Sequence, residues 1–135
     1  MRVLALAIGT AIVTAAHIVT AAHAAGPDAH FERVLKLLEP TDRLEQLCDY
    51  TAMNYIRKDS RRFHPDRAVA RAIRAPRIGP NSIDANGGAF RSRGHWYEMS
   101  YSCAATADHM QVLSFKLTIG AEIPETKWAG YGLWQ

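Results

Sequence analysis

The sequence predicts an α+β fold in which two to three N-terminal helices pack on one face of a three- or four-stranded antiparallel meander. Two observations predict this class. Apolar residues recur every three to four positions over residues 28–56, as in helices, whereas they alternate with polar residues over 96–119, as in strands. Helical patterns come first, and the strands that follow are separated by short turns. Because polar residues occupy the other face of the strands, we expect helices on one face only.

Residues 1–24 have the pattern of a secretory signal peptide. A positive start at Arg2 precedes an almost wholly apolar run from Val3 to Val19, and Ala22-His23-Ala24 matches a small-residue cleavage motif. The apolar run is marginal for a membrane span of about 20 residues, so a retained anchor is the less favoured alternative. We expect cleavage after Ala24, a single domain over residues 25–135, and a location in the periplasm or outside the cell.

Two amphipathic helices are expected before the sheet. Asp28 is placed to cap the first helix, which ends before Pro40. Asp42 followed by Glu45 is similar to a capping box at the start of the second. Glu45 and Asp49 fall on the outer face of this helix, where we expect them to be solvated. The apolar stripes consist of Phe31, Val34, Leu35 and Leu38 in the first helix, and Leu44, Leu47, Cys48, Ala52, Tyr55 and Ile56 in the second.

The segment from Arg57 to Arg77 is strongly basic. It holds eight basic and two acidic residues, a net charge of +6, whereas the remainder of the chain after residue 24 carries −4. Pro65 is suited to the first turn of a third helix, which would bury Ala68, Val69, Ala72 and Ile73. Arg67, Arg71 and Arg74 recur at i, i+4 and i+7. They are therefore predicted to share one exposed helix face.

Three strands are expected after an irregular connection rich in Pro, Gly and Asn over residues 76–88. They are Ala89–Ser92, Trp96–Cys103 and Gln111–Ile119, with turns at Arg93-Gly94 and at residues 106–109. The predicted core consists of Leu44, Leu47, Tyr55, Tyr97, Met99, Tyr101, Leu113, Phe115 and Leu117. C-terminal residues Trp128, Tyr131, Leu133 and Trp134 are expected to cover the open end of this core.

The two cysteines, Cys48 and Cys103, both fall on inward faces, one in a helix and one in a strand. An even cysteine count in an exported chain favours a disulfide, and two separate buried thiols are the alternative. The sequence has no CxxC motif, and its histidines show no short ligand spacing, so neither a metal site nor a cofactor is predicted.

Several blocks of the sequence resemble the bacterial domain of unknown function 930 family. The blocks are Leu37–Asp49, Ala89–Ser92, Trp96-Tyr97, Cys103, Ser114-Phe115, Gly120, Ile123-Pro124 and Trp128. The resemblance covers nearly all of the chain after the signal peptide. It implies an exported protein with paired cysteines, of a kind found mainly in rhizobial alphaproteobacteria. It implies no known activity, substrate or catalytic residue.

Two classes of function are compatible with these patterns. The first is a non-catalytic binding module of the periplasm or envelope, in which Arg67, Arg71 and Arg74 contact an anionic lipid, a polysaccharide or an acidic protein. Nucleic acid is not expected as a partner, because the protein is predicted to be exported. For the arginines themselves, the slightly favoured interpretation is a solvated face whose charges pair with the acidic remainder of the chain.

The second class is a small hydrolase-like enzyme with a site assembled from Arg91, His95, Tyr97 and Glu98. The chain has no G-x-S-x-G nucleophile motif, and a disulfide would occupy both cysteines. Asp108 and His109 are adjacent at a turn, where charged side chains are usually solvated. The binding module is therefore the favoured hypothesis.

Overall fold

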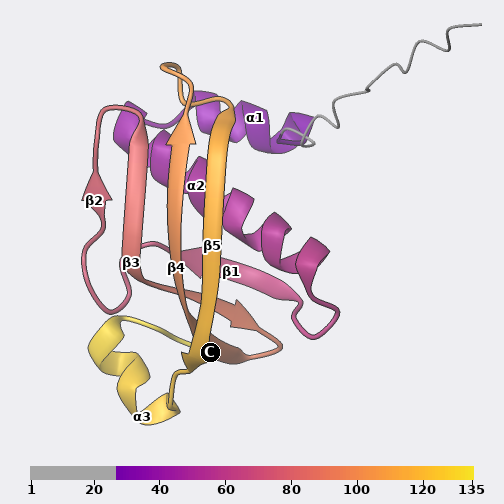
Figure 1. Cartoon of the computed structure of the whole chain (residues 1–135), viewed down its shortest axis with the longest axis vertical. Helices are drawn as coiled ribbons and strands as arrows, with labels where there is room; N and C mark the ends of the chain where they lie inside the picture. The colour runs from indigo at the N-terminus through magenta and orange to yellow at the C-terminus, as the bar shows by residue number, and fades with distance from the viewer. Residues whose placement is uncertain (1–26) are drawn as a thin grey trace, which may run out of the picture.

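The computed structural model describes residues 27–135, so the predicted signal peptide lies outside the described residues. The fold is α+β, as predicted (Figure 1). Its elements are α1 (Ala29–Lys36), α2 (Pro40–Asp59), β1 (Pro65–Val69), β2 (Arg77–Ile78), β3 (Ser82–Ser92), β4 (His95–Ala105), β5 (Val112–Glu122), α3 (Glu125–Trp128) and a 3-10 turn (Ala129–Tyr131).

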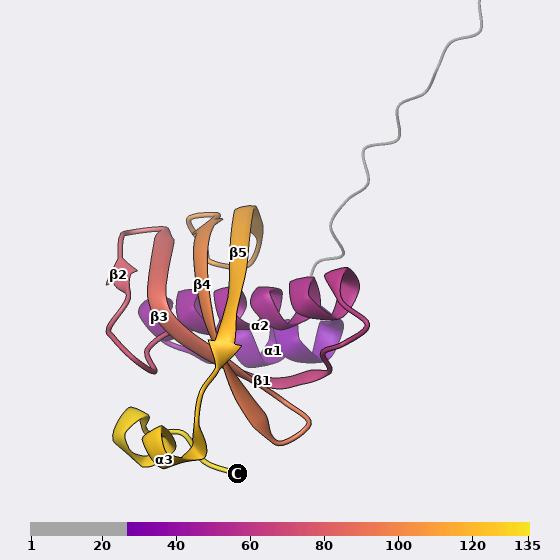
Figure 2. The same ribbon diagram turned by 60° about the horizontal axis from the view of Figure 1, so that its bottom comes forward.

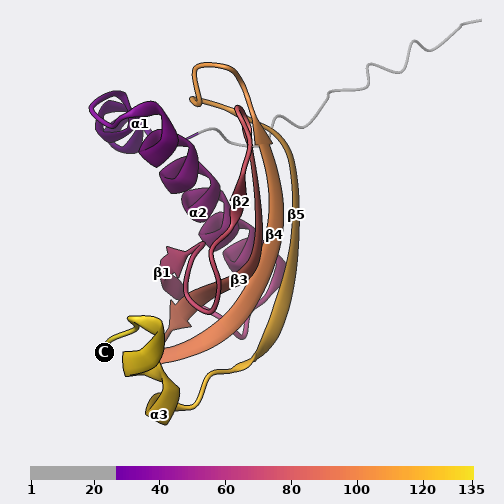
Figure 3. The same cartoon turned by 90° about the vertical axis from the view of Figure 1, so that its left-hand side faces the viewer.

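The sheet is antiparallel and has five strands rather than three or four. Its order is β1-β3-β4-β5, and the short strand β2 also pairs with β3. The three long strands form the predicted meander, and the sheet curves around α2, which lies in its concave side (Figure 3). The first of them, β3, starts earlier than predicted. The reason is that Asn86 and Gly87 are accommodated as a bulge between the paired residues Ala85 and Gly88, instead of ending the strand.

The predicted third helix is wrong. Pro65–Val69 is the edge strand β1, in which Val69 lies opposite Ala89 of β3. The backbone N–H groups of Ala72 and Ile73, expected to be helical, both donate to the carbonyl of Gly87. Pairing with a strand some twenty residues away has overridden the local helical pattern, and proline is tolerated at the first position of an edge strand.

The two N-terminal helices form as predicted, with one change at their junction. The carboxylate of Asp28 caps α1 by accepting from the N–H groups of His30 and Phe31 at 3.0 and 2.9 Å. The second helix begins at Pro40 instead of Asp42, because proline is pre-organised for the first helical position. Arg43 fixes the angle between the helices by donating to the carbonyls of Leu35 and Leu38, both at 2.9 Å.

The main core lies between α2 and the sheet. The disulfide between Cys48 and Cys103 joins them, with the Cα atoms 6.0 Å apart. Nearby, the rings of Tyr101 and Phe115 stack at 5.3 Å. The residues buried in this core are Leu35, Leu44, Leu47, Cys48, Ala52, Ile56, Phe63, Ala70, Ile83, Ala85, Phe90, Met99, Tyr101, Cys103 and Ala105, and Tyr97, Phe115 and Leu117 are partly buried against them.

Two predicted core residues are exposed. Leu113 is 69% exposed because the pairing shifts at the start of β5: Ser114 lies opposite Ala104, whereas Val112 lies opposite Ala105. Val112 therefore packs on the core in place of Leu113. Tyr55 is 48% exposed, since it lies where α2 passes beyond the sheet and contacts Phe115 at the edge strand, with ring centroids 5.1 Å apart.

A second core cluster lies on the opposite face of the sheet, at one end of β3 and β4. It consists of Ala89, Trp96, Ile123, Trp128 and Leu133. The indole of Trp96 is fully buried and donates to the carbonyl of Trp134 at 2.7 Å. Figure 2 shows α3 at this end of the molecule, away from α1 and α2. The C-terminal residues therefore build a second cluster instead of closing the open end of the main core. The predictions that they cover that core and that only one face of the sheet is covered are both wrong.

Candidate functional site

The three predicted binding arginines do not share a helix face. Arg67 lies on β1, whereas Arg71 and Arg74 lie in the connection between β1 and β2. The guanidinium of Arg71 forms a two-point ion pair with the carboxylate of Glu45 on α2, and its Nε lies 2.9 Å from Oε1. Glu45 is therefore not a freely solvated residue, and the charge of Arg71 is compensated.

A different set of arginines gathers where α2 ends and β1 begins. Arg57 donates to the carbonyl of Pro65 at 2.6 Å, and the N–H of His64 donates to Ser92 Oγ at 2.8 Å. These bonds bring the end of α2, the following turn and the β3–β4 hairpin together. The arginine surface, as we call it, consists of the exposed residues Arg57, Arg61, Arg62, Arg67 and Arg93.

The basic segment that supplies four of the five arginines contains two acids. Within residues 57–67 the acids are Asp59 and Asp66. Asp66 is engaged by Arg91, whose Nε and Nη2 lie 3.0 and 2.6 Å from its two carboxylate oxygens. This pair holds the pKa of Asp66 below its usual value. The five arginines and Asp59 therefore carry a net charge of +4.

The sequence indicated the basic segment but not this arrangement. Arg93 belongs to the predicted tight turn, which is confirmed: Arg93 and Gly94 have φ of 52° and 81°, the positive values of a two-residue hairpin turn. It lies next to Ser92, which pairs with Pro65. Only the pairing of β1 with β3 brings Arg93 to the basic segment, and no local signal in the sequence predicts that pairing.

The structure divides the predicted enzyme site between the two faces of the sheet. Arg91 lies opposite Trp96, and Phe90 lies opposite Tyr97. Since neighbouring residues of a strand point to opposite faces, Arg91 and Tyr97 are on different sides. The ring of Tyr97 stacks on that of Phe90, with centroids 5.3 Å apart, as part of the core.

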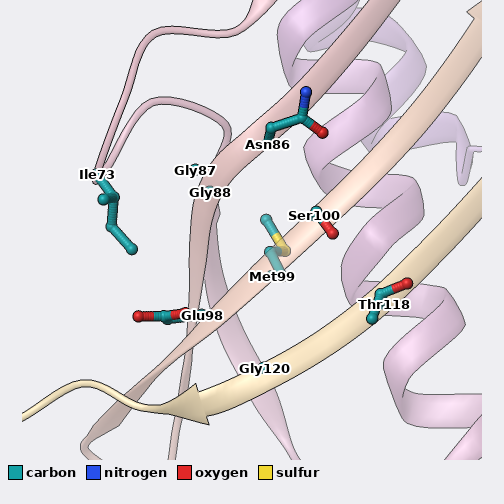
Figure 4. A pocket seen from close by; sticks show the side chains of 9 residues that line it. All are labelled: Ile73, Asn86, Gly87, Gly88, Glu98, Met99, Ser100, Thr118 and Gly120. Carbon is teal, nitrogen blue, oxygen red and sulfur yellow. The ribbon is translucent and has the colours of Figure 1, made fainter.

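The other two members of the predicted enzyme site are also separated. His95 Nδ1 lies 2.8 Å from a carboxylate oxygen of Glu122, in an exposed pair. Glu98 lines a small hollow of about 110 Å³ at the bulge of β3 (Figure 4). The hollow is lined by Ile73, Asn86, Gly87, Gly88, Glu98, Met99, Ser100, Thr118 and Gly120. Because Glu98 is the single ionisable residue of this lining, the hollow lacks the paired groups of acid–base catalysis.

A groove of about 670 Å³ lies between α2 and the beginning of β5. One side is formed by α2, from Leu47 to Lys58, and the other by Met110–Phe115. Pro27 and Glu32 bound it near α1. The exposed side chains of Tyr55 and Leu113 line this groove. Both residues were predicted to lie in the core, so the two incorrect predictions concern the same surface.

Asp49 is buried, contrary to the prediction that it is solvated. It is 5% exposed, because the segment around Ala70 covers this face of α2, and it accepts a hydrogen bond from the hydroxyl of Tyr101 at 2.8 Å. Burial raises the pKa of Asp49 to about 7, and the nearby carboxylate of Glu45 adds to the increase. Asp49 lines neither the groove nor the hollow, and its hydrogen bond to Tyr101 links α2 to β4 within the core.

His109 is a second buried polar residue, although it lies in a turn. Its Nδ1 is 2.7 Å from the carbonyl of Pro40, and its Nε2 is 2.9 Å from that of Pro80 and 3.0 Å from Asn81 Oδ1. The ring thus links the start of α2, the β2–β3 connection and the β4–β5 turn. His109 therefore connects three segments of the fold, and it lines neither the groove nor the hollow.

Comparison with known protein families finds a matching family model. The family model Domain of Unknown Function (DUF930) matches residues 35–133. The chain belongs to the DUF930 family. No curated protein and no solved structure matches it. The matched part of this DUF930 protein includes both cysteines, the arginine surface and nearly all of the groove.

Two further properties bear on the function of this DUF930 protein. Within residues 27–135, no group of three or more His, Cys, Asp or Glu side chains is placed to hold a metal ion. In the same residues, none of the helices has both the length and the apolar character needed to cross a bilayer.

Proposed function

We propose that this DUF930 protein is an exported, non-catalytic binding module whose arginine surface binds an anionic membrane. The observation that carries the proposal is the set of five exposed arginines at the end of α2, on β1 and on the β3–β4 hairpin, with Asp59 as their unengaged acid. None of the five lines the groove or the hollow. They are suited to many separate contacts with an extended anionic surface and not to the enclosure of one small anion.

The chemistry of the set favours lipid phosphates. A guanidinium presents two coplanar donors that can bind two oxygens of one phosphate. The ammonium group of lysine is a compact point charge and lacks this two-point geometry. Each basic residue near an anionic bilayer contributes about 1 kcal/mol of attraction. Five arginines therefore supply reversible binding, and none needs to enter the hydrocarbon region.

Export is part of the proposal. The disulfide between Cys48 and Cys103 supports it, because such bonds form and persist mainly in oxidising compartments. The signal-peptide pattern of residues 1–24 supports it independently. We expect N-terminal sequencing of the native protein to begin at Ala25, whereas a retained Met1 on membrane-bound material would contradict cleavage.

The hydrolase alternative has less support. Its residues lie on opposite faces of the sheet, and Tyr97 is packed in the core. A catalytic site requires groups that converge within hydrogen-bonding reach of one substrate.

The test compares two charge-matched triple variants of the mature protein. One carries Arg61→Gln, Arg62→Gln and Arg67→Gln in the arginine surface, and the other carries Arg74→Gln, Arg77→Gln and Lys127→Gln, which are exposed elsewhere. Binding is measured by co-sedimentation with phosphatidylglycerol vesicles and with phosphatidylcholine vesicles. At about 1 kcal/mol per residue, the first variant should bind phosphatidylglycerol on the order of 100-fold more weakly, and the second should lose far less.

Equal losses in the two variants would show that net charge, and not this surface, governs binding. Dextran sulfate provides a further arm of the experiment. Binding to dextran sulfate without binding to vesicles would replace the membrane by an anionic polysaccharide and contradict the proposal.

A further inference from the structure

We propose that the groove between α2 and β5 binds an extended polypeptide segment, which adds to β5 as an antiparallel strand. This site is separate from the arginine surface, and the inference does not depend on membrane binding. It combines three properties of the groove: an unpaired backbone edge, an incompletely covered apolar face, and ends of opposite charge.

The first property is the free edge of β5. This strand is the last in the sheet order, so one of its edges has no strand partner among the described residues. It has 11 residues, and the part that lines the groove contains neither proline nor glycine. Natural proteins usually shorten, cover or interrupt such an edge, and the bulge at Leu113 interrupts this one at a single position. An extended polypeptide has the alternating donors and acceptors that match it.

The second property is the apolar face beside that edge. Phe115, Leu117 and Ile119 of β5 are only partly buried, whereas Tyr101 and Cys103 of the neighbouring strand are 3% exposed. Tyr55 and Leu113 are exposed at the groove. An added strand would point every second side chain toward α2, so apolar residues at alternate positions would cover these surfaces.

The third property sets the length of the segment and the charges expected at its two ends. The part of β5 and its preceding turn that lines the groove, Met110–Phe115, corresponds to about six residues of extended chain, or about 20 Å. Glu32 and Lys58 both line the groove. Figure 1 shows α1, the helix that carries Glu32, on the side of the molecule where β5 begins, whereas Lys58 belongs to the last turn of α2. An antiparallel segment therefore places its N-terminal end near Lys58 and its C-terminal end near Glu32. Charge complementarity calls for an acidic residue at the first end and a basic residue at the second.

The test uses two blocked synthetic heptapeptides, Asp-Val-Ser-Val-Ser-Val-Lys and its charge-reversed form Lys-Val-Ser-Val-Ser-Val-Asp. Binding to the mature protein is followed by NMR chemical-shift changes, which also locate the site. We expect the first peptide to bind about fivefold more tightly, the ratio expected for two exposed ion pairs, and to shift the amides of residues 110–117. Equal affinity for the two peptides, or shifts elsewhere, would overturn the proposal.

A variant pair tests the charged end of the groove. Lys58→Glu should remove or invert the preference between the two peptides, because it replaces the positive end by a negative one. Lys127→Glu is the matched control, since Lys127 is exposed on α3 and lies outside the groove. It should leave the preference unchanged. A preference that survives Lys58→Glu would contradict the assigned direction.

N-methylation of the peptide tests backbone pairing. In an antiparallel strand the N–H groups of alternate residues face the same neighbour. One peptide is methylated on the backbone nitrogens of its three valines, and a second on those of its two serines. One of these two peptides should therefore lose binding, and the other should keep it nearly intact. Loss in both cases or in neither would exclude strand addition. Sedimentation equilibrium without peptide completes the test, because a dimer that the peptide dissociates would assign the edge of β5 to a second copy of the chain.

Discussion

At the scale of single residues, the buried carboxyl group of Asp49 couples the stability of the fold to pH. Its carboxyl group is buried against Tyr101, and its pKa is raised to about 7 from the ordinary 3.8. In the unfolded chain the group ionises near pH 4, so the folded state binds the extra proton between pH 4 and 7. The free energy of unfolding therefore falls as pH rises through this interval, by about 4 kcal/mol in total.

The variant Asp49→Asn isolates this effect. Asparagine keeps an acceptor for the Tyr101 hydroxyl and cannot ionise, so the decrease between pH 4 and 7 should disappear. We expect Asp49→Asn to unfold at a higher urea concentration than the wild type at pH 8, and to show a smaller or opposite difference at pH 4. Urea titrations at the two pH values measure this. Parallel pH profiles for the two proteins would contradict the buried, protonated state of Asp49.

At the same scale, the shifted pairing of β5 distinguishes two residues that were both predicted to be buried. Leu113 is exposed, so Leu113→Ala should change the free energy of unfolding by less than about 0.5 kcal/mol. Phe115 is partly buried against Tyr101 and Tyr55, and Phe115→Ala should cost about 2 kcal/mol, below the range for a fully buried phenylalanine. Denaturant unfolding of both variants provides the comparison. A larger loss for Leu113→Ala would mean that Leu113 and not Val112 packs on the core.

At the scale of elements, the disulfide ties α2 to β4 and closes a loop of 55 residues. In the chain-entropy model, closing such a loop contributes about 4 kcal/mol. The double variant Cys48→Ala and Cys103→Ala should therefore show a markedly lower melting temperature, while the single variant Cys48→Ala should also expose one reactive thiol in a thiol assay. Two reactive thiols in the unreduced wild type would contradict the bond.

The elements also show which parts of the fold the sequence could predict. The stripe of α2 and the alternation of β4 depend on neighbouring residues, so the helix, the strand and the inward direction of both cysteines follow from local patterns. The strand β1 does not, because its form depends on pairing with β3 far along the chain. The arginine surface has the same origin: composition indicates a basic segment, but β-pairing decides that Arg67 and Arg93 belong together while Arg71 pairs with Glu45.

At the scale of the whole molecule, the two candidate surfaces have different chemistry. The arginine surface is exposed and cationic, whereas the groove is partly apolar and lies beside a free strand edge. The disulfide and the main core cluster join α2 to the sheet, and the second core cluster joins the C-terminal segment to the sheet. The fold therefore acts as a rigid support on which an anionic membrane and a polypeptide could be bound independently.

Membrane binding through exposed charge is the central claim, and its salt dependence tests it most directly. The measurement is the dissociation constant of the mature wild-type protein for phosphatidylglycerol vesicles as sodium chloride is raised from about 0.1 M to about 1 M. The Debye length falls from about 10 Å to about 3 Å over this range, so binding through the arginine surface should weaken by at least tenfold while the fold stays intact. Binding that persists at about 1 M salt, or that is equally strong on phosphatidylcholine, would contradict the claim.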